Sequence, residues 1–212
     1  MLGTQDLLLF VVSGLLLNVT PGPDTLYIVG RSSTQGVRAG ATAALGIGVG
    51  TLVHITAAAF GLSAILAASA TAFTLVKIVG AAYLLYVGIS LIRTAGSASE
   101  RAAATGMAPA TLRTIFLQGF LTNVLNPKVA LFFLAFLPQF VASDAASKPL
   151  AFLFLGAIFD VNGTLWNLFV AWSAARITGG LRRSFAAMQW FKRCVGSVFV
   201  YLGIRLAFVK EG

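Results

Sequence analysis

Long apolar runs separated by short polar stretches dominate this chain. Each run holds about 20 residues or more, which is enough to cross a hydrocarbon core of about 30 Å as an α-helix. The runs are approximately 7–30, 39–67, 73–92, 114–141, 150–174 and 190–209. The pattern predicts an all-α, polytopic membrane protein with six transmembrane helices.

The polar connections are short, and the longest runs from about Arg93 to Arg113. They leave no room for a folded domain outside the membrane, so one transmembrane domain is expected to account for residues 1–212. The mean hydropathy of +0.91 and a charged fraction of 10% agree with this class. No basic cluster precedes the first run, and no cleavage site follows it, so a cleaved signal peptide is not expected.

The first apolar run contains a stretch that breaks helices, Asn18-Val-Thr-Pro-Gly-Pro-Asp24. In a helix, Pro21 would leave the carbonyl of Leu17 without its partner, because proline lacks an N–H group. A break at membrane depth is tolerated only where protein or a water-filled cavity satisfies the freed groups. We therefore expect Asn18, Pro21, Gly22, Pro23 and Asp24 to form one wall of an internal polar site.

The fourth run contains a second break. Asn126 is a favourable N-cap and Pro127 a favourable first helical residue, so a new half-helix is expected to begin there and to free the carbonyl of Asn123. In the same way, Pro23 can open a half-helix whose first turn holds Asp24 and Thr25. Such N-terminal ends carry partial positive charge and unpaired N–H groups that suit a carboxylate.

Three motifs recur in the same order in the two halves of the chain. They indicate a duplicated unit of three helices, about 1–95 and about 112–212. Three is odd, so the second unit must enter the membrane from the opposite side, which predicts an inverted repeat with broken helices 1 and 4 and a site near the midplane. The paired segments are 14–23 and 119–128, 50–54 and 163–167, and 77–89 and 193–204.

The net charge of +9 comes from Lys and Arg residues that lie mostly in or beside the first, third and fifth connections. By the positive-inside rule this bias places both termini outside the cytoplasm. The basic residues read as topology signals and contacts with anionic lipid rather than as a nucleic-acid surface. The stretch 176–193 fits either a short helix on the membrane surface or an ordinary basic loop.

Asp24 and Asp160 are the acidic residues far inside apolar runs. An ionisable group there costs about 2.5–3.5 kcal/mol on insertion scales, so each is a candidate functional residue. Lys128 lies in the first turn of its half-helix, where the dipole disfavours a cation and an anionic neighbour is expected. The two acids could carry protons, face a substrate ammonium, or form a fixed ion pair with Lys128.

Other polar residues in the runs have two interpretations. Asn18 and Asn123 either contact a substrate or satisfy the freed carbonyls. His54 is either a proton relay or a histidine that finds a hydrogen bond on an apolar helix. Asn162 and Asn167 follow Asp160 by two and seven residues and are further candidates.

The sequence lacks the residue patterns of an enzyme active site or a metal site. The chain has no His/Cys cluster, no nucleophile with a base at useful spacing and no phosphate-binding loop, so no cofactor or metal is expected. Cys194 is the one cysteine, which excludes an internal disulfide and a dithiol electron carrier. The glycines at 46, 48 and 50 fit close helix packing, either internal or against another subunit, so a homo-oligomer stays open.

The pair of motifs Asn-x-x-Pro-Gly-Pro-Asp (18–24) and Asn-x-x-Asn-Pro-Lys-x-x-Leu-Phe-Phe (123–133) resembles the LysE/RhtB family of amino-acid exporters. The resemblance extends over nearly the whole chain. It implies export of amino acids or close derivatives across the bacterial cytoplasmic (inner) membrane by an antiporter driven by the proton or another ion gradient. The positions that carry over by motif are Asn18, Pro21, Gly22, Pro23, Asp24, Asn123, Asn126, Pro127 and Lys128.

With only two intramembrane carboxylates, the sequence favours a neutral substrate such as homoserine, threonine or leucine over a cationic one. Two alternatives to a secondary exporter remain open. One is a membrane assembly or interaction protein that transports nothing, and the other is a passive amino-acid channel.

Overall fold

The computed structural model describes residues 3–64, 70–94, 107–142 and 145–176, together with 190, 193–198, 200–201 and 203–204. Within these residues the chain is helical and has no strand beyond a bridge between Thr4 and Val141, which confirms the all-α class. The elements are α1 (Leu7–Val19), α2 (Pro23–Thr56), the π-helix η1 (Ala57–Leu62), α4 (Ala70–Thr94), α6 (Leu112–Val124), α7 (Pro127–Leu131), the π-helix η2 (Phe132–Phe136), the 3₁₀-helix η3 (Leu137–Phe140) and α8 (Lys148–Arg176). The described positions from 193 to 204 are helical as well.

The first apolar run is broken where the sequence predicted. α1 ends at Val19, and α2 begins at Pro23 with Asp24 in its first turn. Thr20 and Gly22 each precede a proline, and both have extended backbone, with ψ of 118° and −169°. A proline disfavours the helical region for the residue before it, so the two prolines together account for the break.

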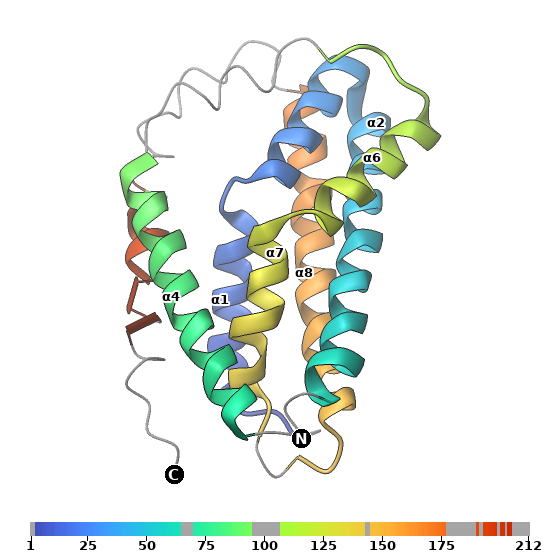
Figure 1. The fold of residues 1–212 in the computed structure, drawn as a ribbon. Helices are drawn as coiled ribbons and strands as arrows, with labels where there is room; N and C mark the ends of the chain where they lie inside the picture. The colour runs from blue at the N-terminus through green and yellow to red at the C-terminus, as the bar shows by residue number, and fades with distance from the viewer. Residues whose placement is uncertain are drawn as a thin grey trace.

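The chain reverses direction inside α2. Gly36 has φ of 82°, a left-handed value that glycine adopts without steric cost. A methyl carbon added at Gly40 would lie 1.8 Å from the Ser32 side-chain oxygen, although eight residues of straight helix would separate them by about 12 Å. The sequence predicted a polar connection between residues 30 and 39, and the structure reverses direction within it at Gly36, with helix on both sides of the turn (Figure 1).

The fourth apolar run is also broken as predicted. α6 and the segment Pro127–Phe140 are bent by 44° relative to each other, and Asn126 caps the new helix. Figure 1 shows that α2 and α7 both begin near the middle of the bundle and leave it in opposite directions.

Length and apolar composition identify the helices of the described residues that can cross a membrane. Pro23–Leu62 and Lys148–Arg176 qualify, and the bent pair Leu112–Val124 and Pro127–Phe140 qualifies if it is taken as one span. The prediction of six crossings in two inverted units is therefore not decided by these criteria. The predicted surface helix at 176–193 lies almost entirely outside the described residues.

Two apolar clusters fill the bundle on either side of its middle. One is rich in phenylalanine, including Phe10, Phe132 and Phe152, and joins α1, η1, η2, η3 and the first half of α8. The other joins both arms of α2 to α6 and the second half of α8, around Ile28 and Ile115. The breaks in the first and fourth runs lie between the two clusters.

Glycines allow α2 to approach its neighbours closely. α2 makes its most extensive contacts with α6 and α8. A methyl carbon added at Gly46 would lie 2.3 Å from the Phe116 carbonyl oxygen, and one added at Gly119 would lie 2.6 Å from the Ala43 carbonyl oxygen. The backbones of α2 and α6 therefore touch at Gly46 and Gly119, and the contact at Gly46 is the close packing that the glycine pattern predicted.

This contact predicts that Gly46→Ala destabilises the protein. The methyl group would force α2 and α6 apart at a cost of about 1–3 kcal/mol, which corresponds to a fall in Tm of about 2 °C or more. Thermal unfolding of purified protein in detergent measures the change. The matched control is Gly61→Ala, because a methyl carbon there meets nothing within 4 Å. Equal Tm values for the two variants would contradict the contact.

Candidate functional site

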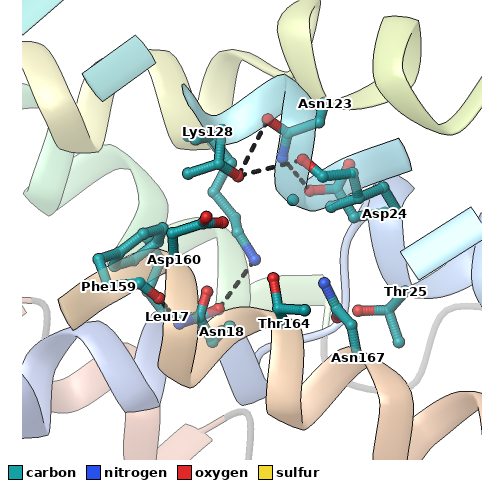
Figure 2. A pocket seen from close by; sticks show the side chains of 15 residues that line it. Leu17, Asn18, Asp24, Thr25, Asn123, Lys128, Phe159, Asp160, Thr164 and Asn167 are labelled. Atoms are coloured by element: carbon teal, nitrogen blue, oxygen red, sulfur yellow. Dashed lines mark hydrogen bonds between the residues drawn. The ribbon is translucent and has the colours of Figure 1, made fainter. Parts of the chain in front are cut away.

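A small polar cavity lies between the two apolar clusters, where the helix breaks meet. Its volume is about 30 Å³, which is room for about two water molecules. Figure 2 shows side chains from α1, α2, α6, α7 and α8 converging on it. The residues that line it are Leu17, Asn18, Asp24, Thr25, Ile47, Gly48, Thr51, Asn123, Lys128, Val129, Phe159, Asp160, Gly163, Thr164 and Asn167.

Lys128 binds the carbonyl groups that the first break leaves free. Its ammonium donates hydrogen bonds to the carbonyl oxygens of Leu17, at 2.9 Å, and Thr20, at 2.8 Å. The Leu17 carbonyl is the one whose helical partner would have been the N–H that Pro21 lacks. A cation from the second break therefore compensates the first, and one of the three ammonium N–H groups is left for another partner.

Asp24 is held by the opposite half of the chain. Asn123 donates a 2.9 Å hydrogen bond from its side-chain nitrogen to Asp24 Oδ2. Its side-chain oxygen, Oδ1, accepts a 3.3 Å hydrogen bond from the Thr51 hydroxyl. Asp24 Oδ1 is buried and has no hydrogen-bond partner. A buried carboxylate oxygen without a donor is costly, so it is ready to accept a hydrogen bond from a ligand.

Lys128 does not form an ion pair with either acid of the cavity. Among the described residues, no carboxylate oxygen lies within 4.0 Å of the Lys128 nitrogen. The sequence predicted an anionic neighbour for Lys128, and backbone carbonyls take that place instead. In Figure 2 the Lys128 side chain extends between Asp24 and Asp160 toward Leu17.

Local hydrogen bonds and one distant contact serve the backbone groups of the second break. The Asn126 side-chain oxygen accepts a 3.0 Å hydrogen bond from the Lys128 N–H, which caps the helix that Pro127 begins. The carbonyl of Asn123 lies 3.0 Å from His54 Nε2. The same carbonyl accepts the Asn126 N–H at 2.9 Å, and His54, which does not line the cavity, is its second partner.

Asp160 lies on the α8 wall of the cavity. Thr164 and Asn167 follow it at four and seven residues and face the same space, whereas Asn162 points to another side of the helix. α2 approaches this wall closely, because a methyl carbon added at Gly48 would lie 2.8 Å from the Thr164 hydroxyl and 3.6 Å from Asp160 Oδ1. The structure thus brings Asp160 and Asn167 into the site but not Asn162.

Asn18 lines the cavity on the side of the first break, and Gly22 lies beside Lys128 without lining it. Asn18 lies at the end of α1, where its side-chain nitrogen is 3.4 Å from the Phe159 carbonyl oxygen. A methyl carbon added at Gly22 would lie 3.4 Å from the Lys128 nitrogen. Pro21 and Pro23 shape this segment without lining the cavity.

Several cavity residues were not singled out in the sequence. Thr51 and Thr164 occupy matching positions in the repeated Gly-Thr pairs at 50–51 and 163–164. The repeated Gly-Thr pair is therefore the sequence signal for both threonines. Gly48 and Gly163 have no side chain, and their role is seen in the close approach of neighbours.

The cavity presents complementary groups to a small zwitterion. Asp24 Oδ1 can accept from an ammonium, and the remaining Lys128 N–H can donate to a carboxylate. Hydrogen bonding within α2 begins with the Leu26 N–H, which donates to the Gly22 carbonyl. The N–H groups of Asp24 and Thr25 come before it and have no acceptor within the helix, so they too can donate to an anion.

We expect Lys128→Met to lower the stability of the protein even without a ligand. The substitution leaves the Leu17 and Thr20 carbonyls without their donor, at a cost of about 1–3 kcal/mol. Thermal unfolding in detergent measures the loss, with Lys148→Met at the outer end of α8 as the control. A Lys128→Met variant with the Tm of the control would show that the two carbonyls do not depend on this ammonium.

Comparison with known proteins places the chain among membrane proteins of bacteria. It is 31% identical over 208 residues to the uncharacterized membrane protein PA4757 of Pseudomonas aeruginosa, covering 97% of this chain and 96% of that protein. It is 27% identical over 205 residues to the leucine efflux protein of Enterobacter sp. (strain 638), covering 97% of this chain and 96% of the relative. The uncharacterized membrane protein YrhP of Bacillus subtilis (strain 168) is 29% identical over 207 residues, which cover 95% of this chain and 98% of YrhP. No solved structure matches the chain.

The family model described as LysE type translocator matches residues 15–210. This range includes both helix breaks and every residue that lines the cavity. The chain belongs to the LysE type translocator family.

Proposed function

We propose that this protein is a secondary transporter that exports an amino acid from the cytoplasm through the cavity between the two helix breaks. The observation that carries the proposal is the buried Asp24 Oδ1, which has no partner, beside Lys128 and the first turn of α2. A zwitterion offers one group of each sign to these residues. Membership of a translocator family and the efflux role named for its relatives support the same function.

In this mechanism the substrate ammonium binds Asp24. Asn123 fixes the carboxylate through Oδ2, so Oδ1 keeps a defined direction toward the ligand. The substrate carboxylate binds the third N–H of Lys128 and the free N–H groups at the start of α2, where the helix dipole favours an anion. Lys128 is held in place by two carbonyls and does not need to reorganise when the ligand arrives.

Transport requires the cavity to open alternately to each side. A volume of about 30 Å³ is far below the 300–1,000 Å³ typical of ligand pockets, so the described arrangement corresponds to a closed state. The phenylalanine-rich cluster and the cluster around Ile28 and Ile115 lie on opposite sides of the cavity, where each can act as a gate. Separating the helices at one cluster while the other stays packed would give alternating access.

Contacts between the halves support an inverted repeat. A methyl carbon added at Gly50 would lie 3.1 Å from Asn123 Oδ1, and one added at Gly163 would lie 3.1 Å from Asn18 Oδ1. Gly50 matches Gly163 in the sequence repeat, and Asn18 matches Asn123. The two contacts therefore pair the same two repeat positions in opposite halves, which supports the two-fold relation that an inverted repeat requires.

The substrate is proposed to be a neutral amino acid with an aliphatic side chain. The described cavity offers two carboxylates, Asp24 and Asp160, and the ammonium group of the substrate occupies the first. Relatives are named leucine efflux proteins, which fits this class. Asp160, on the opposite wall, is the proposed carrier of the proton that exchanges for the substrate.

Two conservative substitutions test binding and coupling separately. We expect Asp24→Asn to lower the initial rate of leucine uptake into inside-out vesicles by about tenfold or more, because a charged hydrogen bond to the ammonium is lost. Asp160→Asn should keep leucine counterflow but lose its acceleration by an imposed pH gradient. Wild-type rates and pH-gradient dependence in both variants would contradict the roles of the two acids. A wild-type protein without gradient-dependent flux of any amino acid would favour the channel or assembly alternatives.

The distribution of basic residues predicts the orientation of the chain in the inner membrane. The excess of Lys and Arg in the odd-numbered connections places both termini outside the cytoplasm. A C-terminal alkaline phosphatase fusion should therefore be enzymatically active and a C-terminal green fluorescent protein fusion dark. The reverse pattern would place both termini in the cytoplasm and contradict the predicted orientation.

A further inference from the structure

Arg31 is a buried cation outside the cavity between the breaks. The charge pattern assigned it to the first connection, but it lies inside α2, and its side chain is 6% exposed. Arg38, seven residues further along the chain, is exposed at the same end of the bundle. The membrane surface therefore does not explain Arg31 as it explains Arg38.

Neutral groups surround the Arg31 guanidinium. Nη1 donates to Gln35 Oε1, at 3.0 Å, and to the Ala108 carbonyl, at 2.9 Å, while Nη2 donates to Gln118 Oε1 at 2.7 Å. Three of the five N–H groups are thus used, and the buried Nε has no hydrogen-bond partner. No carboxylate in the described part of the chain forms an ion pair with it.

Arg31 lines a shallow, widely open cavity of about 700 Å³, whose outer rim includes the exposed side chains of Leu121 and Leu125. We call it the Arg31 cavity. It extends from Arg31 toward the second break, because Leu125 directly precedes Asn126, and Tyr27 is three residues after Asp24. The Arg31 cavity is defined by Tyr27, Arg31, Met107, Gln118, Leu121 and Leu125.

We propose that the Arg31 cavity is a second binding site, which takes the carboxylate of an aliphatic amino acid before the substrate reaches the cavity between the breaks. The inference rests on the proposed export function. Nη2 keeps one N–H group that no described residue uses, and a guanidinium N–H forms a charge-assisted hydrogen bond with a carboxylate. Met107, Leu121 and Leu125 supply apolar contacts for the side chain.

The position of the cavity fits a site that loads the transporter. Arg31 and the segment 107–110 lie toward the end of the bundle that the charge pattern assigns to the cytoplasm, from which the substrate comes. The cavity is already open, whereas the one between the breaks is closed. A ligand held by Arg31 would lie about two helical turns from Asp24, because the two residues are seven positions apart on the same arm of α2.

Arg31 also joins α2 to α6 and to residue 108, so a variant at this position could unfold the protein. Gln118→Glu avoids that difficulty. It keeps the shape of the side chain and its acceptor for the hydroxyl of Tyr27, which lies 3.1 Å from Gln118 Oε1. It also places a carboxylate on Arg31, which would compete with the carboxylate of the substrate.

The experiment measures initial rates of radiolabelled L-leucine uptake into inside-out vesicles as a function of leucine concentration. We expect Arg31→Gln and Gln118→Glu each to raise KM by about tenfold or more, with little change in the rate at saturating leucine, because the cavity between the breaks is intact. The Tm of Gln118→Glu should not fall below the wild-type value. The exposed Arg38→Gln is the matched control and should keep the wild-type KM.

Wild-type KM in folded Arg31→Gln and Gln118→Glu variants would overturn the inference. If Arg31→Gln does not fold, Gln118→Glu alone decides the outcome. Reconstitution with and without phosphatidylglycerol tests whether Arg31 binds an anionic lipid headgroup rather than the substrate. If the lipid changes the transport rate, and Arg31→Gln abolishes that change without altering the KM for leucine, the inference is also overturned. Absence of flux in the wild type would instead refute the export function.

Discussion

The hydrogen bonds from Lys128 to the carbonyls of Leu17 and Thr20 hold the centre of this protein together. A proline at membrane depth leaves carbonyl groups without donors, and lipid offers none. One ammonium from the other half of the chain supplies donors to both carbonyls. The first break can exist because the second break lies against it, so neither half can form its part of the centre alone.

This arrangement also decides what the remaining charge can do. Because Lys128 is committed to carbonyl groups, Asp24 is not neutralised by a direct ion pair and keeps one carboxylate oxygen free. Two apolar clusters enclose Asp24 and Lys128. Glycines on α2 and α8 let these helices approach polar side chains of the cavity closely. The result is a small polar layer with groups of both signs, which is the property that a carrier of zwitterions needs.

The helix breaks could be predicted from the sequence because proline acts on its immediate neighbours. Pro21, Pro23 and Pro127 force the preceding residues out of the helical region, and Asn126 caps the helix that follows. Gly36 gave no comparable local signal, and the reversal inside α2 was expected as a polar connection. A glycine is compatible with a helix, and its left-handed φ becomes necessary only when the two arms of α2 pack against each other.

The sequence by itself determined where the chain breaks, which residues begin the half-helices and that acids lie inside apolar runs, because each depends on local backbone chemistry and hydropathy. Only the tertiary structure decided the partners. It gave Lys128 to carbonyl groups, His54 to the carbonyl of Asn123, and Arg31 to a buried set of neutral acceptors. These contacts join residues about 70 to 110 positions apart. Spacing along the chain carries no information about which of several polar groups will meet across the bundle.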